Sequence, residues 1–473
     1  MDISVSDIAK VTGGEYIGDE TALRRIVSGL TWDSRTIMPD NIFLAMPGMR
    51  VDGNDYVRAA IQRGAGAVVC TRMPTENVIA VAGEFACPMI VVDDGVEALE
   101  KIAGSWRDRL HAIVIGVTGS TGKTSTKDLL SSVFSQRFKT TATQGNQNNE
   151  IGVPATILAA DEDTEVLIVE LGMRGMHQIE HLCTFVKPSI AVVTNVGVSH
   201  MELLGSRENI AHAKSELLSA LPDTGYAVLN ADDEYTPLLE NFAHLAERGV
   251  TVHSYGFSPE AETHAQNVSY DAEACASFEI VTGDAAPVPV TLGMPGRHNV
   301  LNALAAYAAG INMGIAPDDI ARGLAEAKAS GMRMEIEHTP DGVTILNDAY
   351  NANPDSMRAS ISTLMTLEGD GRRIAVLGDM GELGSGEYQL HVDVGTFAAQ
   401  ADLDMLVCIG TLSVGIKAGA LAADMDAARV KSFTGVDEAI AFLEKNVQEG
   451  DLVLVKASRF MELERIVKGI MQR

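Results

Sequence analysis

The sequence predicts an α/β protein with three domains and mostly parallel sheets. Short β-branched runs, such as GAVVC, VLIVELG and DLVLVKAS, alternate with helical stretches along almost the whole chain. Continuous apolar runs of this kind are typical of strands buried on both faces of a parallel sheet. The chain has 473 residues, which at roughly 100–200 residues per domain suffices for two to four domains. A glycine-rich turn between one such strand and a helix is typical of a nucleotide-binding sheet.

Changes in the pattern divide the chain into three blocks. Residues 1–107 end where the run HAIVIGVTG begins a new strand. Residues 108–330 carry the glycine-rich turn. Their stretch around 250–292 (TVHSYGF, ASFEIVTG and PVPVTLG) alternates in the manner of antiparallel strands, and a long alanine-rich helix follows from Asn299. Residues 331–473 have a strand–helix alternation of their own. We therefore expect a central P-loop NTPase-like sheet between an N-terminal α/β domain and a C-terminal Rossmann-like domain.

Charge and composition exclude several classes of partner. Lys and Arg number 36 and Asp and Glu 64, so the formal charge is −28. This balance argues against nucleic acid or an anionic membrane surface, although a local basic pocket could still bind a small anionic substrate. We find no secretory signal, and no apolar run approaches the ~20 residues of a membrane helix. The five scattered cysteines form no CxxC pair, so we expect reduced thiols in a cytoplasmic protein.

The glycine-rich turn is a variant of the phosphate-binding loop. The strict pattern G-x-x-x-x-G-K-[ST] would require a glycine where Val117 stands, and glycines occur at 116 and 119 instead. Strand, loop and helix are nevertheless in order, which argues against a turn without a ligand. Backbone N–H groups and the helix N-terminus favour phosphate oxygens, Lys123 would reach the β- and γ-phosphates, and the Thr124 hydroxyl would bind Mg²⁺. The loop comprises Gly119, Ser120, Thr121, Gly122, Lys123, Thr124 and Ser125. This predicts nucleotide binding and leaves the reaction open.

Three further polar residues follow predicted strands or lie near them. Ligands of open α/β sheets collect at the carboxyl ends of strands. Glu170 closes the run VLIVE and could hold Mg²⁺, although a surface carboxylate is the alternative. His200 follows the run AVVTNV, and a single histidine can equally be structural. Lys214 lies in the predicted helix ENIAHAKSELL, where a lysine is ordinarily solvated.

A series of motifs resembles the Mur ligases of bacterial cell-wall synthesis. The resemblance covers nearly the whole chain and is most specific in YNANP, GDMGELG and the Asn-rich segment. In chain order the motifs are GSTGKTS, GNQNNEIGVP (145–154), VELGMRG, TNVGVSHME, AHAKSE, GRHNVLNALAA (296–306), NDAYNANPDSM (347–357), LGDMGELG (377–384) and VKASRFMELE (455–464). The stretch from Thr31 to Val57 also resembles the family's UDP-sugar domain. In that stretch Asp40-Asn41 replaces the usual Pro-Gly turn, and Asn54 stands where His is common.

The resemblance implies a role for each matching residue. The loop residues 119–125 would bind the ATP phosphates, with Thr124 and Glu170 on one Mg²⁺ and His200 at a second Mg²⁺. Lys214 matches a lysine that is carbamoylated in most members. Arg333 would reach the γ-phosphate, and it follows Met332 where Gly is common. Further matches are Ser34, Arg35, Asn146 and Asn149 on the UDP-linked substrate, Asn299 and Asn302 on the adenine side, and Asp348, Tyr350 and Asn351 in a loop that closes over nucleotide and amino substrate. Asn299 could alternatively cap its helix.

The resemblance further implies ATP-dependent amide bond formation. In the dipeptide-adding branch, the carboxylate of UDP-MurNAc-tripeptide becomes an acyl-phosphate, which the amine of D-Ala-D-Ala attacks. The C-terminal domain would close on a hinge near residues 325–335, and we expect a monomer. One alternative is the sister ligase that adds the third stem residue, whose diaminopimelate-specific form carries a DNPR motif absent here. A folylpolyglutamate synthetase relative would lack the UDP-sugar domain. A nucleotide-gated binding protein would hydrolyse ATP without making an amide bond.

Overall fold

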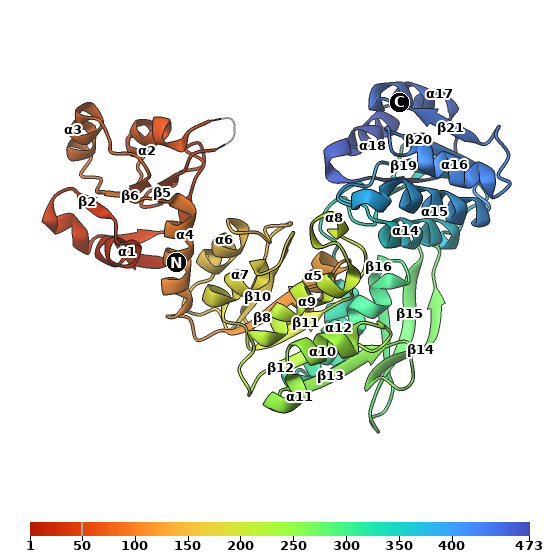
Figure 1. Cartoon of the computed structure of the whole chain (residues 1–473), viewed down its shortest axis with the longest axis horizontal. Helices are drawn as coiled ribbons and strands as arrows, with labels where there is room; N and C mark the ends of the chain where they lie inside the picture. Colours follow the sequence, from red (N-terminus) through yellow and green to blue (C-terminus); the bar gives the residue numbers. More distant parts are fainter. Residues whose placement is uncertain (49–50) are drawn as a thin grey trace. The chain divides into compact units, whose positions relative to one another are not determined.

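The computed structural model describes residues 1–48 and 51–473 (Figure 1). Residues 49 and 50, within the stretch that resembles the UDP-sugar domain, lie outside the described part. Contacts group the chain into two compact units, one comprising residues 1–116, 138–172 and 180–188 and the other 117–137, 173–179 and 189–473. The three block boundaries drawn from the sequence stay predictions.

The N-terminal region contains a five-stranded sheet in the order β2-β7-β6-β5-β4 and a two-stranded antiparallel pair of β1 and β3. Strands β4 to β7 are parallel, and β2 joins β7 in the antiparallel direction. The elements are β1 (Asp2–Ser4), α1 (Val5–Thr12), β2 (Glu15–Ile17), η1 (Glu20–Arg24), β3 (Ile26–Ser28), β4 (Leu30–Thr31), β5 (Ile42–Ala45), η2 (Gly53–Tyr56), α2 (Val57–Gln62), β6 (Ala67–Cys70), α3 (Glu76–Glu84), β7 (Met89–Val91) and α4 (Gly95–Arg107).

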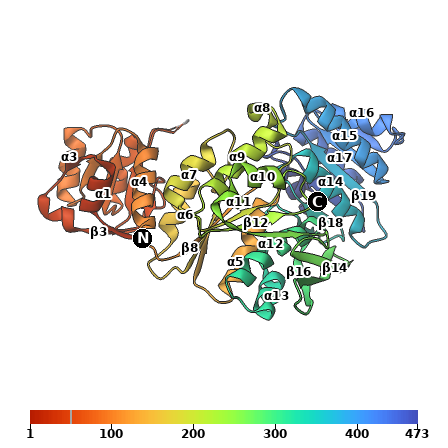
Figure 2. The same ribbon diagram turned by 60° about the horizontal axis from the view of Figure 1, so that its bottom comes forward.

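A nine-stranded sheet follows, in the order β16-β15-β14-β13-β12-β11-β8-β10-β9. Its elements are β8 (Ile113–Thr118), α5 (Lys123–Ser135), β9 (Thr140–Ala142), α6 (Gly152–Ala159), β10 (Val166–Glu170), α7 (Gln178–Val186), β11 (Ile190–Val193), α8 (Met201–Leu204), α9 (Arg207–Ser219), β12 (Tyr226–Asn230), α10 (Thr236–Phe242), α11 (Leu245–Arg248), β13 (Thr251–Gly256), β14 (Thr263–Tyr270), β15 (Cys275–Thr282), β16 (Val288–Pro295), α12 (His298–Asn312) and α13 (Pro317–Glu326). Helix α5 packs against α12 and α13 (Figure 2).

The expected antiparallel stretch is confirmed for two of its three segments. Strands β15 and β16 pair antiparallel with each other, and β14 pairs antiparallel with β15. The prediction is wrong for TVHSYGF, because β13 runs parallel to both β12 and β14. Helices α10 and α11 lie between β12 and β13 in the chain and return it to the same end of the sheet. Alternation of polar and apolar side chains shows which face of a strand is buried. It does not show whether the strand runs parallel or antiparallel to its neighbour.

The C-terminal region has a six-stranded sheet in the order β17-β18-β22-β19-β20-β21. Only β17, among the strands of this sheet, pairs antiparallel with its neighbour. The elements are β17 (Glu335–His338), β18 (Thr344–Asn347), α14 (Pro354–Thr366), β19 (Arg373–Gly378), η3 (Gly384–Gly386), α15 (Glu387–Gln400), β20 (Met405–Ile409), α16 (Val414–Ala422), β21 (Val430–Phe433), α17 (Val436–Asn446), β22 (Leu452–Lys456), η4 (Arg459–Met461) and α18 (Glu464–Met471). This parallel α/β arrangement confirms the predicted fold class.

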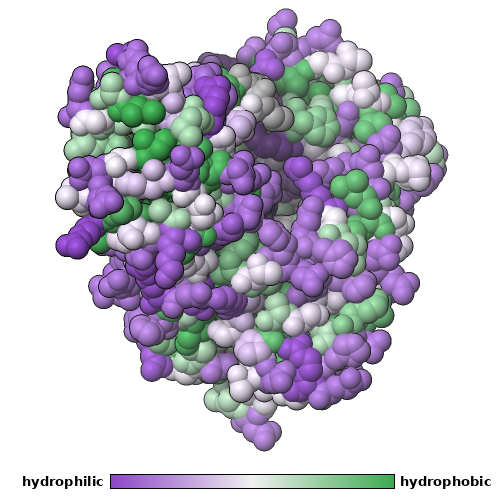
Figure 3. Space-filling view, turned by 60° about the vertical axis from the view of Figure 1, so that its left-hand side comes forward, coloured by the Kyte–Doolittle hydropathy of each residue, from purple (hydrophilic) through white to green (hydrophobic). Residues whose placement is uncertain are grey.

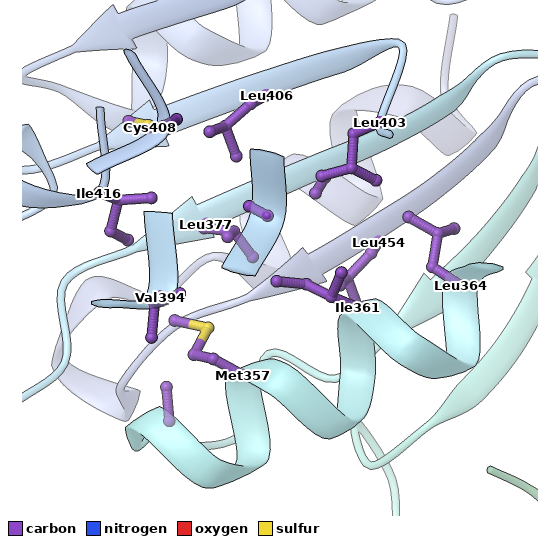
Figure 4. Close-up of a cluster of buried hydrophobic side chains, with 14 of the residues drawn as sticks. Met357, Ile361, Leu364, Leu377, Val394, Leu403, Leu406, Cys408, Ile416 and Leu454 are labelled. Carbon is purple, nitrogen blue, oxygen red and sulfur yellow. The ribbon is translucent and has the colours of Figure 1, made fainter. Parts of the chain in front are cut away.

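One hydrophobic core of this region lies between the sheet and helices α14, α15 and α16. Met357, Ile361 and Leu364 project from one face of α14 toward Leu377 and Leu454 of the strands (Figure 4). These side chains repeat at three and four residues along the helix, as an amphipathic helix requires. The packing fixes the ends of these strands, from which the loops of this region begin.

Figure 3 shows polar residues over most of the face drawn, with hydrophobic residues in small separate groups, which is ordinary for a globular protein. Within the described residues, no helix is long and apolar enough to cross a bilayer. All five cysteines are buried, and none of them forms a disulfide within the described residues.

Close packing of α15 on α16 gives a test of the C-terminal fold. A Cβ added at Gly395 would lie 1.8 Å from the carbonyl oxygen of Ile416, on the facing helix. We expect Gly395→Ala to lower the stability of this region by about 2 kcal/mol or more, because the helices must separate. Urea unfolding monitored by circular dichroism measures the change. Gly83→Ala in α3, where a Cβ would meet nothing within 4 Å, is the control and should be neutral or stabilising. Equal stability of the two variants would contradict the packing.

Candidate functional site

The predicted phosphate loop is a tight turn between β8 and α5. Strand β8 ends at Thr118 and α5 begins at Lys123, with Gly119 at φ +151° and Gly122 at φ +78°. Both angles favour glycine. A Cβ at Gly119 would also lie 1.8 Å from Thr194 Oγ1, and one at Gly122 would lie 2.6 Å from Asn302 Oδ1. The two glycines therefore stand where the backbone comes too close to Thr194 and Asn302 for any side chain. This explains the variant spacing.

The segment after β11 holds this loop in shape. Asn195 Oδ1 accepts a hydrogen bond from the N–H of Thr121 at 3.0 Å, and its Nδ2 donates to Thr121 Oγ1 at 2.8 Å. Thr194 Oγ1 donates to the carbonyl oxygen of Thr121 at 2.5 Å, and the N–H of Gly197 donates to Ser120 Oγ at 2.9 Å. The sequence identified Ser120 and Thr121 but not Asn195, because nothing local marks an asparagine after a strand as a partner of the loop.

The loop lysine stays close to the turn. Lys123 Nζ donates to the carbonyl oxygen of Gly119 at 2.7 Å, and Thr124 beside it is buried. An ammonium and several N–H groups thus gather at one helix N-terminus, which is the arrangement that binds phosphate oxygens.

The two asparagines predicted on the adenine side are paired behind the loop. Asn302 Nδ2 donates to Asn299 Oδ1 at 2.9 Å, and Asn302 Oδ1 accepts from Thr126 Oγ1 at 3.2 Å. Asn299 is fully buried and donates to the carbonyl oxygen of Pro295 at 2.8 Å, so its side chain does not cap α12 by accepting from backbone N–H groups. The pair supports α5 and the loop, and adenine contact stays a prediction.

Lys214 is buried in α9 rather than solvated, contrary to the ordinary expectation for a helix lysine. Its exposed fraction is 1%. Burial, and secondarily the positive charge of Lys123, lowers the pKa of the Lys214 amine well below its usual range, while Asp233 opposes the shift. Among the described residues the amine has no ion-pair partner. Removal from water favours the neutral form of an amine, and a neutral amine is a nucleophile.

Glu170 ends β10 as predicted and has one oxygen unsatisfied. Asn148 Nδ2 donates to Glu170 Oε1 at 2.8 Å, whereas Oε2 is buried and has no hydrogen-bond partner among the described residues. A buried carboxylate oxygen of this kind fits a cation ligand, since it otherwise loses solvation without compensation. The predicted substrate residues Asn146 and Asn149 are both exposed, and Asn149 Oδ1 accepts from the N–H of Gly152 at the start of α6. Sequence reasoning missed Asn148, which lies in the same Asn-rich motif.

His200 and its neighbour contact motifs of the C-terminal region. His200 lies before α8 with φ +64°, and its Nδ1 is 2.6 Å from Glu382 Oε2. The close contact with His200, against the effect of burial, lowers the pKa of the Glu382 carboxyl. Asn353 Nδ2 donates to Ser199 Oγ at 2.6 Å. GDMGELG and YNANP therefore meet the segment after β11, and Glu382 is a contact that sequence reasoning did not single out.

The residues predicted in the C-terminal closing loop divide into exposed and buried groups. The Arg333 guanidinium lies 4.2 Å from the centre of the Tyr350 ring, a cation–π contact that leaves the N–H groups available. Asp348 is buried and accepts from Lys456 Nζ at 2.5 Å. Asn351 is exposed. Arg333 and Tyr350 are thus half-buried, whereas Asp348 is buried and organises the loop.

The predicted N-terminal substrate residues lie in the loop after β4. Ser34 is nearly buried, and its carbonyl oxygen accepts from Arg63 Nη1 at 2.7 Å. Arg35 is exposed and forms a two-pronged pair with Asp33, with Nη2 to Oδ2 at 2.7 Å. This pair lowers the pKa of Asp33 to about 2. Asn54, where His is common, donates to Thr71 Oγ1 at 2.9 Å and so has a structural contact.

Comparison with known proteins identifies relatives of all three regions. Family models match the chain as "Mur ligase family, catalytic domain" at residues 26–107, "Mur ligase middle domain" at 117–310 and "Mur ligase, glutamate ligase domain" at 332–459. The chain is 37% identical to the UDP-N-acetylmuramoyl-tripeptide–D-alanyl-D-alanine ligase of Bacillus subtilis, over 99% of this chain and 98% of that protein.

Solved structures give the same result. The chain matches a crystal structure of MurF from Acinetobacter baumannii with a TM-score of 0.87 and 27% identity, over 100% of this chain and 99% of that one. It matches MurF ligase from Thermotoga maritima in complex with ADP with a TM-score of 0.78 and 26% identity, over 94% and 97% of the two chains.

The close approach at Gly119 gives a test of the phosphate loop. We expect Gly119→Ala to weaken nucleotide binding at least tenfold, because the new methyl group would displace Thr194 and with it the loop. Titration with a fluorescent ATP analogue measures the affinity. Gly175→Ala, where the nearest atom to a new Cβ is 3.8 Å away, is the control and should bind as the parent does. Unchanged affinity of the Gly119 variant would remove this loop from the nucleotide site.

Proposed function

Because this chain belongs to the Mur ligase family, we propose that it joins UDP-N-acetylmuramoyl-tripeptide to D-alanyl-D-alanine in an ATP-dependent reaction. The product is UDP-MurNAc-pentapeptide, a precursor of peptidoglycan. The observation that carries this assignment is the full-length similarity to the Bacillus subtilis ligase of that specificity. The phosphate loop and the C-terminal motifs of this chain supply the groups that the reaction needs.

The first step transfers the γ-phosphoryl group of ATP to the terminal carboxylate of the tripeptide. The bond between the γ-phosphorus and the bridging oxygen breaks, ADP leaves, and an acyl-phosphate forms. Catalysis of such a transfer consists mainly of positioning and charge neutralisation. Lys123 and the N–H groups at the start of α5 hold the phosphates, and Arg333 neutralises the transferring group. The restraint of the loop by Thr194 and Asn195 supports this role, since a fixed set of donors needs no rearrangement during the reaction.

Magnesium fits the Glu170 carboxylate as a ligand. The buried Glu170 Oε2, without a hydrogen-bond partner among the described residues, is a hard oxygen ligand of the type that Mg²⁺ prefers. We assign Thr124 and Glu170 to one ion, and His200 with carbamoylated Lys214 to a second. When bound, Mg²⁺ would supply positive charge for the phosphate oxygens.

The burial of Lys214 supports a carbamate at this position. The neutral amine that burial favours can add CO₂, with loss of one proton, to give a carbamate anion. That reaction places an anion near Lys123, to which it is attracted, whereas the protonated amine would be repelled by Lys123. The carbamate then provides oxygen ligands where an ammonium would repel a metal ion.

The second step is attack of the D-Ala-D-Ala amine on the acyl carbon, with departure of phosphate. Water would compete for the acyl-phosphate, so the site must exclude it. The contacts of Ser199 with Asn353 and of His200 with Glu382 support such exclusion, because they join the C-terminal motifs to the segment beside the phosphate loop. The reaction belongs in the cytoplasm, where ATP and nucleotide-linked precursors occur.

A ligation assay tests the function. Purified protein is incubated with ATP, Mg²⁺ and UDP-MurNAc-tripeptide, with and without D-Ala-D-Ala, and the products are identified by mass spectrometry. We expect pentapeptide only when the dipeptide is present, and its loss in Lys123→Ala. Amide bond formation between a single amino acid and the dipeptide-stage precursor would assign the sister ligase instead. ADP without any new amide bond would assign a nucleotide-gated binding protein.

Chemical rescue tests the carbamate. Lys214→Ala should lose at least about 100-fold in kcat, because the site loses an anionic ligand. Formate or acetate should recover part of that loss by occupying the vacated space with a carboxylate. Lys139→Ala changes an exposed lysine and should leave kcat and its response to these acids as in the parent. Full activity of the Lys214 variant without added acid would argue against the carbamate.

A further inference from the structure

Lys456 is a buried cation for which the reaction described above has no use. It is the last residue of β22, which runs parallel to its neighbour β18, so the carboxyl ends of both strands meet. Lys456 is 2% exposed. Its Nζ donates to Asp348 Oδ2 at 2.5 Å and to the carbonyl oxygen of Asn351 at 2.9 Å. The lysine thus contacts two residues of the NDAYNANP motif.

Asp348, the partner of Lys456, is fully engaged. Oδ2 also accepts from Ser360 Oγ at 2.7 Å, and Oδ1 accepts from the N–H of Met334 at 3.2 Å. Met334 is the residue next to Arg333. The buried carboxylate therefore contacts the short segment that carries the arginine proposed for the γ-phosphate.

Arg333 is a second cation close to Lys456. The positive charge of Arg333 contributes to a lowered pKa of Lys456, after burial and against the attraction of Asp348. Arg333 lies on the Tyr350 ring, and its guanidinium has no ion pair with Asp348 among the described contacts. His298 at the start of α12 also faces the pair, and burial lowers its pKa to about 4. It therefore stays neutral at physiological pH and adds no third cation.

We propose that Lys456 is a positioning residue, which occupies Asp348 and thereby leaves the Arg333 guanidinium free for the transferring phosphate. A buried carboxylate that loses its partner takes the nearest available cation, because an unpaired charge is strongly disfavoured there. Without Lys456, that cation is Arg333. The side chain would turn from Tyr350 toward Asp348 and leave the phosphate without its C-terminal charge. This inference rests on the proposed ligase function.

Lys456→Met tests the proposal by removing the charge at nearly constant length. We expect kcat for ligation to fall at least 100-fold, with the KM for UDP-MurNAc-tripeptide within threefold of the parent. Lys445→Met alters an exposed lysine of the same region and should change neither constant. Far-UV circular dichroism and thermal melts establish that each variant is folded before its kinetics are compared.

Two double variants separate positioning from a general structural role. Lys456→Met combined with Arg333→Ala should be no slower than Arg333→Ala alone, because both changes remove the same phosphate contact. Lys456→Met combined with Asp348→Asn should regain at least tenfold in kcat over Lys456→Met, since no buried carboxylate is left to attract Arg333. Additive losses in the first pair, or no recovery in the second, would overturn the proposal.

A different variant is used if Lys456→Met does not fold. Lys456→Arg keeps a cation beside Asp348, and its kcat should remain within tenfold of the parent. A folded Lys456→Arg protein as slow as Arg333→Ala would also overturn the proposal. The parent protein is assayed in parallel, so a parent that makes no pentapeptide rejects the ligase function itself, whereas an active parent with additive variants rejects only the role of Lys456.

Discussion

The segment between β11 and α8 is the constraint on which the candidate site depends. Its first residues, Thr194 and Asn195, bond the phosphate loop through Thr121. Its later residues, Ser199 and His200, meet the C-terminal motifs at Asn353 and Glu382. One short stretch therefore fixes the shape of the phosphate loop and also contacts the C-terminal loops that carry Asn353 and Glu382. A shift of this stretch would disturb both halves together.

Two buried lysines, Lys456 and Lys214, differ in how the protein compensates their charge. Each loses hydration, which lowers the pKa of its amine. Lys456 has Asp348 as a direct partner, so its charge is compensated within the protein. Lys214 has no such partner among the described residues and lies in the field of another cation. The environment of Lys456 stabilises an ammonium, whereas that of Lys214 disfavours one. We therefore assign a positioning role to Lys456 and chemical modification to Lys214.

Local patterns in the sequence predicted the parallel strands, the helix after the phosphate loop and the position of Glu170 at a strand end. These patterns did not predict contacts between residues that are far apart in the chain. Asn148 and Asn195 matter because strands distant in sequence end beside one another, which no spacing in the chain reveals. The burial of Lys214 depends on which face of α9 packs inward, and the run AHAKSELL is apolar on more than one side.

The linker between α13 and β17 connects the helix of the phosphate loop to Arg333. Ser330 is held by Asp128 of α5, the helix that begins at the phosphate loop, through its N–H at 2.8 Å and its hydroxyl at 3.0 Å. Met332 and Met334 then adopt φ values of +59° and +50° on either side of Arg333. Left-handed angles at residues other than glycine cost roughly 1–3 kcal/mol each and persist only where surrounding contacts impose them. Here the imposing contacts are the Asp128 anchor before the turn and the Asp348 bond to Met334 after it. Glycine, common at position 332 in the family, would relieve that cost and loosen the segment. Methionine at this position therefore favours one fixed direction for Arg333 over freedom of the linker, which agrees with a site that works by positioning charge.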